Sequence, residues 1–220
     1  MLLQDPCHQA DHDHRAVVRT THDVLVDCAA RTPDAIALVD ADGPAGQSRT
    51  WTYAELRDDS ARLAVALLSR FEPGERIAVW APDRPERVLL QFAAGLAGLV
   101  LVTVNPAYQA RELGFILDHA EAVGLFLVES HRGNPLSRIA AEVAAGHPRL
   151  REVIDLMDTT RLYAKQRIVD GLPEVRPEDP AQILYACGAA GRLRGAILHH
   201  RDLIKGARRA LGATRTAAAA

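Results

Sequence analysis

Cysteine, lysine and aromatic residues are all scarce in this sequence of 220 residues. The three cysteines, Cys7, Cys28 and Cys187, form no CxxC pair. A set this small, with an odd number of cysteines, excludes a disulfide scaffold and is typical of a reducing compartment. Lysine occurs only at Lys165 and Lys205, so 24 of the 26 basic residues are arginine. A mechanism that needs a reactive lysine therefore has only two candidates.

An excess of charge of one sign is also lacking, because 26 Lys and Arg face 28 Asp and Glu, a formal net charge of −2. This balance gives no global attraction to nucleic acid or to a membrane surface, and we expect neither as a partner. Residues 192–220 are locally basic. No aromatic residue accompanies them, so we interpret this segment as a solvated helix face rather than a nucleic-acid surface.

Long apolar runs are equally rare. The first 16 residues, MLLQDPCHQADHDHRA, carry acids and histidines where a signal peptide has an apolar run. We predict no specific metal site in this polar tail. Residues 88–104 are uncharged, but Gly95 and Gly98 interrupt them, which favours a buried helix followed by a buried strand over a membrane span. We expect a cytoplasmic protein.

The rest of the sequence alternates short apolar runs with segments of helical period. Thr52 and Glu55 form a capping-box pattern that predicts the start of a long helix. Further helices are expected near residues 85–97, 113–120 and 135–145, and from about residue 201. Strands are expected at residues 35–39, 49–52, 76–80, 99–104, 123–128, 153–156 and 181–185. This alternation predicts an α/β fold with a doubly wound, mostly parallel sheet and helices on both faces.

Four segments follow from this pattern. Residues 1–21 are expected to be a polar tail, and residues 22–156 an α/β subdomain. Residues 157–180 are rich in proline and charge and are expected to form an ordered connector. Residues 181–220 are expected to hold a strand, a small-residue loop and a last helix.

The loop in the last segment carries the chemistry. Gly188, Gly191 and Gly195 are interleaved with Arg192 and Arg194. Glycines let backbone N–H groups turn inward as an anion-binding nest, and guanidinium groups match phosphate oxygens. The pattern is neither GxxxxGK[ST] nor GxGxxG. From the residues alone, the loop is therefore either a phosphate-binding loop or a plain tight turn between strands.

A resemblance to a known protein family favours the phosphate-binding loop over the tight turn. The loop is similar to the phosphate loop YTSGTTGxPKG of adenylate-forming (AMP-binding) enzymes. Residues 50–56, TWTYAEL, and 102–113, VTVNPAYQAREL, also resemble this family, the second its fatty-acyl-CoA synthetase branch. The resemblance runs from about residue 22 to about residue 212. It implies a fatty acid, ATP with Mg²⁺, and CoA as reactants, which form an acyl-adenylate and then a CoA thioester.

The resemblance also assigns roles residue by residue. Gly188, Gly191 and Gly195 match the loop glycines, Arg194 stands in place of the loop lysine, and His200 matches a histidine beside the acyl pocket. The loop's four hydroxyl-bearing positions have lost their hydroxyls, because the chain has Ala186, Cys187, Ala189 and Ala190 there. A hydrogen bond to a charged phosphate contributes roughly 1.5–3 kcal/mol, so ATP binding is expected to be weak or lost.

The family's catalytic lysine has no counterpart at Lys165 or Lys205, so we assign no catalytic residue. We expect the N-terminal part of a fatty acid–CoA ligase, truncated relative to the family and inactive alone, in effect a pseudoenzyme. The alternatives are a non-catalytic acyl- or nucleotide-binding module, an interaction module, or a truncated gene product. An exposed sheet edge in such a chain would favour self-association.

Overall fold

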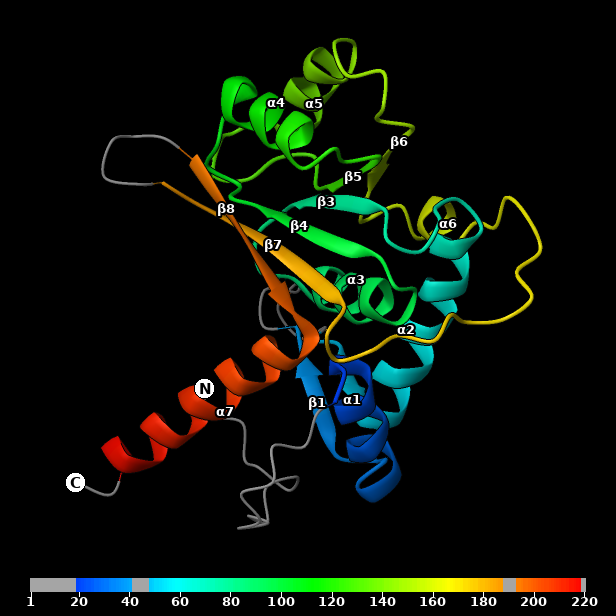
Figure 1. Ribbon diagram of the computed structural model, residues 1–220, viewed down its shortest axis with the longest axis vertical. Coiled ribbons are helices and arrows are strands. Elements are labelled where there is room, and N and C mark those ends of the chain that lie inside the picture. Colours follow the sequence, from blue (N-terminus) through cyan, green and yellow to red (C-terminus); the bar gives the residue numbers. More distant parts are fainter. Residues whose placement is uncertain (1–18, 41–47, 188–192, 219–220) are drawn as a thin grey trace.

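A six-stranded sheet with the order β6-β5-β3-β4-β7-β8 forms the centre of the computed structural model (Figure 1). The structure describes residues 19–40, 48–187 and 193–218. Strands β3 to β7 run parallel, and β8 is antiparallel to β7. The strands of this sheet are β3 (Arg76–Trp80), β4 (Val100–Val104), β5 (Gly124–Leu127), β6 (Glu152–Asp155), β7 (Pro180–Cys187) and β8 (Leu193–His199). Two further strands, β1 (Ile36–Val39) and β2 (Thr50–Thr52), form a separate antiparallel pair.

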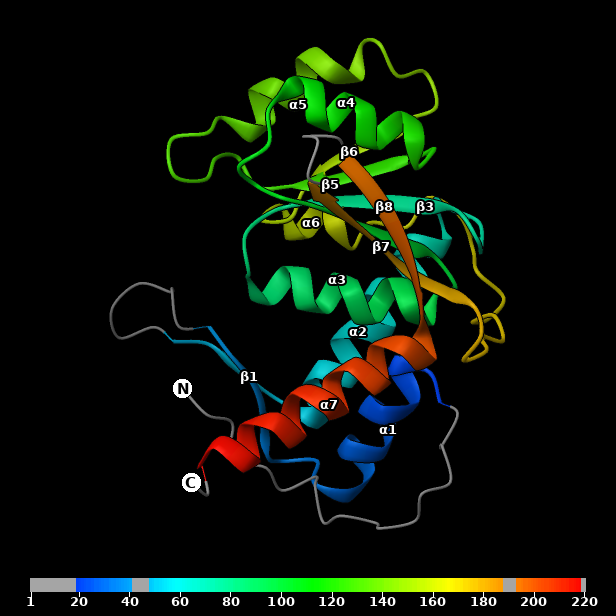
Figure 2. The ribbon, with the colours of Figure 1, turned by 60° about the vertical axis from the view of Figure 1, so that its left-hand side comes forward.

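Helices cover both faces of the sheet (Figure 2). Helices α2 (Tyr53–Leu68) and α3 (Pro85–Leu96) pack on one face, with α1 (Thr21–Arg31) against them. Helices α4 (Ala110–His119) and α5 (Leu136–Ala144) pack on the other face. This arrangement confirms the predicted α/β class with a mostly parallel sheet. Among the described residues, no helix is long and apolar enough to cross a membrane.

The central strands are apolar along their whole length because both of their faces are buried. Ile77, Ala78 and Val79 of β3 have no exposed surface, as parallel strands between two helical layers require. The predicted capping box at the start of α2 is confirmed. The backbone N–H of Glu55 donates to Thr52 Oγ1, and the backbone N–H of Thr52 donates to the Glu55 carboxylate over 2.8 Å. These two bonds satisfy donors that the first helical turn leaves open.

Helix α1 and strand β8 lie where the sequence predicted neither. Helix α1 begins at Thr21, through a second capping box between Thr20 and Asp23 that sequence reasoning missed. Strand β8 replaces part of the predicted loop, because pairing with β7 satisfies the backbone of a segment whose Gly and Ala carry no strand signal. Cys28 of α1 is buried and disulfide-bonded, which the scarcity of cysteine does not predict.

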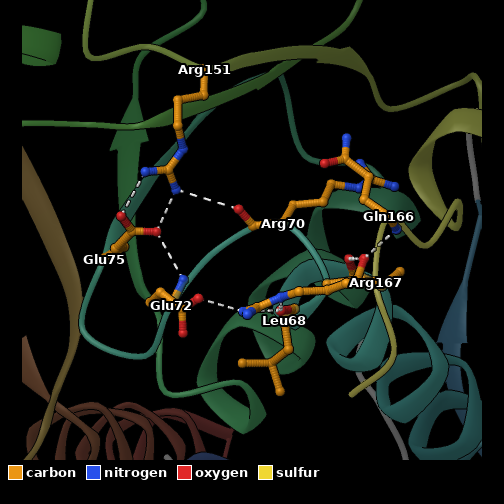
Figure 3. A network of polar contacts seen from close by, with 9 residues as sticks. Leu68, Arg70, Glu72, Glu75, Arg151, Gln166 and Arg167 are labelled. Atoms are coloured by element: carbon orange, nitrogen blue, oxygen red, sulfur yellow. Dashed lines mark hydrogen bonds and ion pairs between the residues drawn. The ribbon is translucent and has the colours of Figure 1, made fainter.

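Arginine side chains bind the predicted connector to the body of the fold (Figure 3). Within it lies the short helix α6 (Thr159–Leu162). Arg167 donates to the carbonyl of Leu68 at the end of α2 over 2.9 Å. Arg70, just after α2, donates to the carbonyl of Arg161 in α6 over 2.6 Å. These contacts hold the segment around α6 and Arg167 against the end of α2.

Candidate functional site

Two of the predicted loop residues lie in β8, at the edge of the sheet. Gly188 and Gly191 lie outside the described residues. Arg194 and Gly195 lie in β8 and are exposed. Gly195 has a packing reason to be glycine, because a Cβ there would lie 3.1 Å from the ring of Tyr185 in β7. The Tyr185 hydroxyl is in turn 2.7 Å from Nδ1 of His119 in α4.

His200, the predicted acyl-pocket residue, is the first residue of helix α7 (His200–Ala218) and has no exposed surface. Its Nδ1 is 3.1 Å from Oγ1 of Thr21, the first residue of α1. Gly95 of α3 makes room for the ring, since a Cβ there would lie 3.1 Å from His200 Cε1. Nε2 has no hydrogen-bond partner among the described residues. From the start of α7, the buried ring of His200 thus contacts α1 and α3.

The environment of His200 favours the neutral ring. Burial lowers the pKa of His200, and the carboxylates of Asp179 and Asp23 oppose this shift without cancelling it. Burial also lowers the pKa of His22, whose Nδ1 has no hydrogen-bond partner among the residues described. The first turns of α1 and α7 therefore each contain a histidine whose neutral form is favoured by burial.

A cavity of about 880 Å³ lies at the carboxyl ends of the central strands. Its walls are three loops, one after each of β3, β4 and β5. They contribute residues 81–83 with Arg87, residues 105–107 with Gln109, and residues 131–135. Small-molecule sites occupy about 300–1,000 Å³, so this volume is large enough for a drug-sized or nucleotide-sized ligand.

The order of the strands explains why the cavity lies there. From β3 the chain passes through α3 to β4 on one side, and from β5 it passes through α5 to β6 on the other. The loops that follow the neighbouring strands β3 and β5 therefore lead to opposite faces of the sheet. A crevice opens between such loops, and ligands of doubly wound sheets bind there. Sequence reasoning missed these residues. The only local sign of these residues in the sequence is that polar residues directly follow buried strands. The order of the strands must also be known to predict that the three loops lie together.

Asn134 fastens two walls of the cavity to each other. Its Nδ2 donates to the carbonyls of Pro106 and Tyr108 over 2.9 and 3.0 Å. Its Oδ1 accepts a hydrogen bond from Gln109 Nε2 over 3.1 Å. The loop after β5 is therefore bound to the loop after β4 by three hydrogen bonds from one side chain.

The turn that carries Asn134 has a special backbone. Arg132 has φ 48° and Gly133 has φ 81°, and backbone hydrogen bonds between His131 and Asn134 close the turn. A left-handed conformation is unfavourable for arginine, and such strain concentrates at functional sites. The cavity also contains Arg87, which forms an ion pair with Asp83. The cavity is lined by the guanidinium groups of Arg87 and Arg132 and by the carboxylate of Asp83, so the excess of positive charge favours an anionic ligand.

The fold and the cavity define a doubly wound α/β protein with a ligand site at its topological switch point. The family model described as AMP-binding enzyme matches residues 25–219, and the chain belongs to this family. The match confirms the resemblance drawn from the phosphate loop and the motifs before it.

Two curated relatives illustrate the family. The human mitochondrial medium-chain acyl-CoA ligase ACSF2 is 28% identical over 214 residues, which cover 84% of this chain and 34% of the relative. The salicyl-AMP ligase / salicyl-S-ArCP synthetase of Mycobacterium tuberculosis is 32% identical, over 79% of this chain and 32% of the relative. The chain spans about a third of the length of these relatives.

Solved structures agree on the fold. The crystal structure of VinN has a TM-score of 0.66 and 26% identity, covering 83% of this chain and 46% of that chain. A putative long-chain-fatty-acid CoA ligase from Rhodopseudomonas palustris has a TM-score of 0.70, covering 90% of this chain and 48% of that chain. At 24% identity, the second likeness shows the fold alone.

Proposed function

We propose that this chain is the N-terminal part of an ATP-dependent fatty acid–CoA ligase. In that reaction a carboxylate displaces pyrophosphate from ATP, and CoA then displaces AMP from the acyl-adenylate to form a thioester. The observation that carries the proposal is the cavity at the switch point, with Arg87 and Arg132 in its walls. We assign to it the phosphate-bearing nucleotide part of a co-substrate, for which CoA is the first candidate.

Binding and positioning are the tasks that this chain's own residues can perform. Arg87, Arg132 and His131 offer donors to phosphate oxygens, and the Asn134 contacts hold the loops in place. Mg²⁺ would neutralise the charge of the triphosphate when bound. In the described part of the chain, no three His, Cys, Asp or Glu residues gather as metal ligands.

The phosphate loop supports a further part of the proposal, that the chain alone does not form acyl-adenylates. Its side chains at residues 186, 187, 189 and 190 lack the family's hydroxyls, so the guanidinium groups of Arg192 and Arg194 and the backbone N–H groups remain as donors for the triphosphate. The test is pyrophosphate–ATP exchange by the purified chain with medium- and long-chain acids. We expect no exchange above the background without enzyme. Robust exchange that depends on the acid would contradict the proposal.

Calorimetry tests the cavity directly, with CoA as the titrant. We expect binding that weakens about ten- to a hundredfold in Arg132→Ala, because a charge-assisted hydrogen bond contributes roughly 1.5–3 kcal/mol. Arg138→Ala is the matched control, since Arg138 is exposed on α5 and lies outside the cavity. Equal CoA affinities in the wild type and Arg132→Ala would refute the assignment.

A second candidate function, a non-catalytic nucleotide-binding module, is favoured by the completeness of the cavity. All three walls come from residues 81–135 of this one chain. The two candidates differ in how they handle ATP. A ligase part should bind MgATP through the loop, so Arg194→Ala should weaken it. A binding module should respond only to substitutions at Arg87 and Arg132.

A further inference from the structure

The ion pair between Asp83 and Arg87 lies in the wall of the cavity. Its two side chains differ sharply in exposure, because Arg87 exposes 24% of its side chain and Asp83 exposes 100%. Arg87 belongs to the first turn of α3, which holds it in the wall. The Asp83 carboxylate can therefore turn away into water without losing any burial, while Arg87 keeps its place beside the cavity.

The Asp83 carboxylate has little to do for the stability of the fold. The N-cap residue of α3 is Arg84, and among the described residues the Asp83 side chain accepts a hydrogen bond from Arg87 alone. Arg84 pairs with Glu86 over 3.3 Å, so Asp83 is the carboxylate that remains for Arg87. An ion pair this exposed adds little to stability. It does occupy the guanidinium group that an anionic ligand of the cavity needs.

We propose that Asp83 is a built-in competitor for the ligand, which makes the cavity select phosphomonoester dianions over singly charged phosphodiesters. This inference rests on the proposed function, in which the cavity binds the phosphate-bearing part of a co-substrate. The Asp83 carboxylate is tethered beside Arg87, so it competes for the guanidinium group at a high effective concentration. A monoanion that displaces it exchanges one negative charge for another and gains no attraction.

A phosphomonoester dianion gains more from the same exchange. It brings two negative charges against the single charge of Asp83. Arg132 lines the same cavity and has no ion-pair partner among the residues described, so it adds to this attraction. A guanidinium group also matches phosphate oxygens with paired hydrogen bonds, which suits a group with three terminal oxygens. The exchange needs only a rotation of the exposed Asp83 side chain, whose carboxylate is then hydrated.

Calorimetry at low salt tests this selection with two matched titrants, since CoA carries a phosphomonoester and dephospho-CoA differs only in lacking it. In Asp83→Asn we expect CoA to bind roughly two- to fivefold more tightly, the range of an exposed ion pair. Dephospho-CoA should gain more, because Arg87 becomes available to its singly charged phosphates. The ratio of the CoA affinity to the dephospho-CoA affinity should therefore shrink, and this change should fade as the salt concentration rises.

The direction of this change separates competition from simple repulsion. If Asp83 only repelled the ligand, it would repel the dianion more, and its removal would enlarge the ratio. Two controls locate the effect. Asp58→Asn removes a carboxylate that pairs with Arg57 on α2, outside the cavity, and it should leave the ratio at its wild-type value. In an Arg87→Ala background, Asp83→Asn should no longer shrink the ratio, because the group for which Asp83 competes is gone.

A ratio that stays constant or grows in Asp83→Asn would overturn the inference, as would an equal shrinkage in Asp58→Asn or in the Arg87→Ala background. If Arg132→Ala weakens CoA binding while Asp83→Asn leaves the ratio unchanged, the proposed function stands and this inference fails. AMP and cyclic AMP, a second pair of monoester and diester, cover the case in which CoA does not bind. A ratio that shrinks for this pair in Asp83→Asn would support the inference without the proposed function, and no binding of either pair would overturn both.

Discussion

Replacing Asn134 by alanine tests how the cavity keeps its shape. The substitution removes three hydrogen bonds, two to the carbonyls of Pro106 and Tyr108 and one from Gln109. A hydrogen bond contributes about 0.5–1.5 kcal/mol net, and water can reach part of this site, so we expect a loss of about 1–3 kcal/mol in the free energy of unfolding. In a domain of this size each kcal/mol lowers Tm by about 2–4 °C.

Urea unfolding followed by tryptophan fluorescence measures this loss. Trp80 is a suitable probe because its indole N–H donates to the carbonyl of Asn105, in a wall of the cavity, over 2.9 Å. Asn134→Asp is the matched comparison. Its carboxylate still accepts from Gln109, but it places an acceptor oxygen against the carbonyl oxygens of Pro106 and Tyr108, so its stability should fall at least as far as that of Asn134→Ala.

The same variant should weaken CoA binding, because a loop that is no longer fastened must be ordered again when the ligand binds. The reasoning is refuted if Asn134→Ala changes the free energy of unfolding by less than about 0.5 kcal/mol, the range of an ordinary surface substitution. Unchanged stability together with unchanged CoA affinity would mean that the loops hold their positions without Asn134.

Two further predictions concern the body of the fold. A Cβ on Gly124 would lie 2.7 Å from the ring of Phe71, so Gly124→Ala should lower the free energy of unfolding in urea by about 1–3 kcal/mol, and Phe71→Leu should relieve part of the loss. Burial lowers the pKa of His200, so below pH about 6.5 the unfolded chain binds a proton that the folded chain does not. Stability should therefore fall as the pH drops below about 6.5, and His200→Gln should flatten this slope in pH-dependent thermal melts. His199→Gln, which changes the half-buried neighbouring histidine, is the control, and an unaltered slope in His200→Gln would contradict the account.

Much of the fold could be predicted because its signals are local. The continuous apolar runs of β3 and β4 reflect burial on both faces, and the capping box at Thr52 is readable in four residues. The family, too, follows from short motifs in a constant order. Helix α1 carries an equally local capping box at Thr20 and was missed because the polar residues before it dominate the composition.

The candidate site could not be predicted in the same way. A motif predicts the phosphate-loop residues and His200, but it does not show that His200 is buried against Thr21 and Gly95. Burial of this kind depends on residues almost 180 positions earlier in the chain. No window of sequence contains that information.

By itself, the sequence determined the parallel α/β class, most strands and helices, and the membership of the chain in the AMP-binding family, because periodicity, capping and motifs involve neighbours along the chain. Only the tertiary structure decided that three loops between residues 81 and 135 share one cavity and that β8 is an open edge. Both features depend on the order of the strands in the sheet. The direction of the chain connections reverses between β3 and β5, which separates the loops that follow these two strands. Strand β8 comes last in the order, after β7, so it has no second neighbour in the described chain.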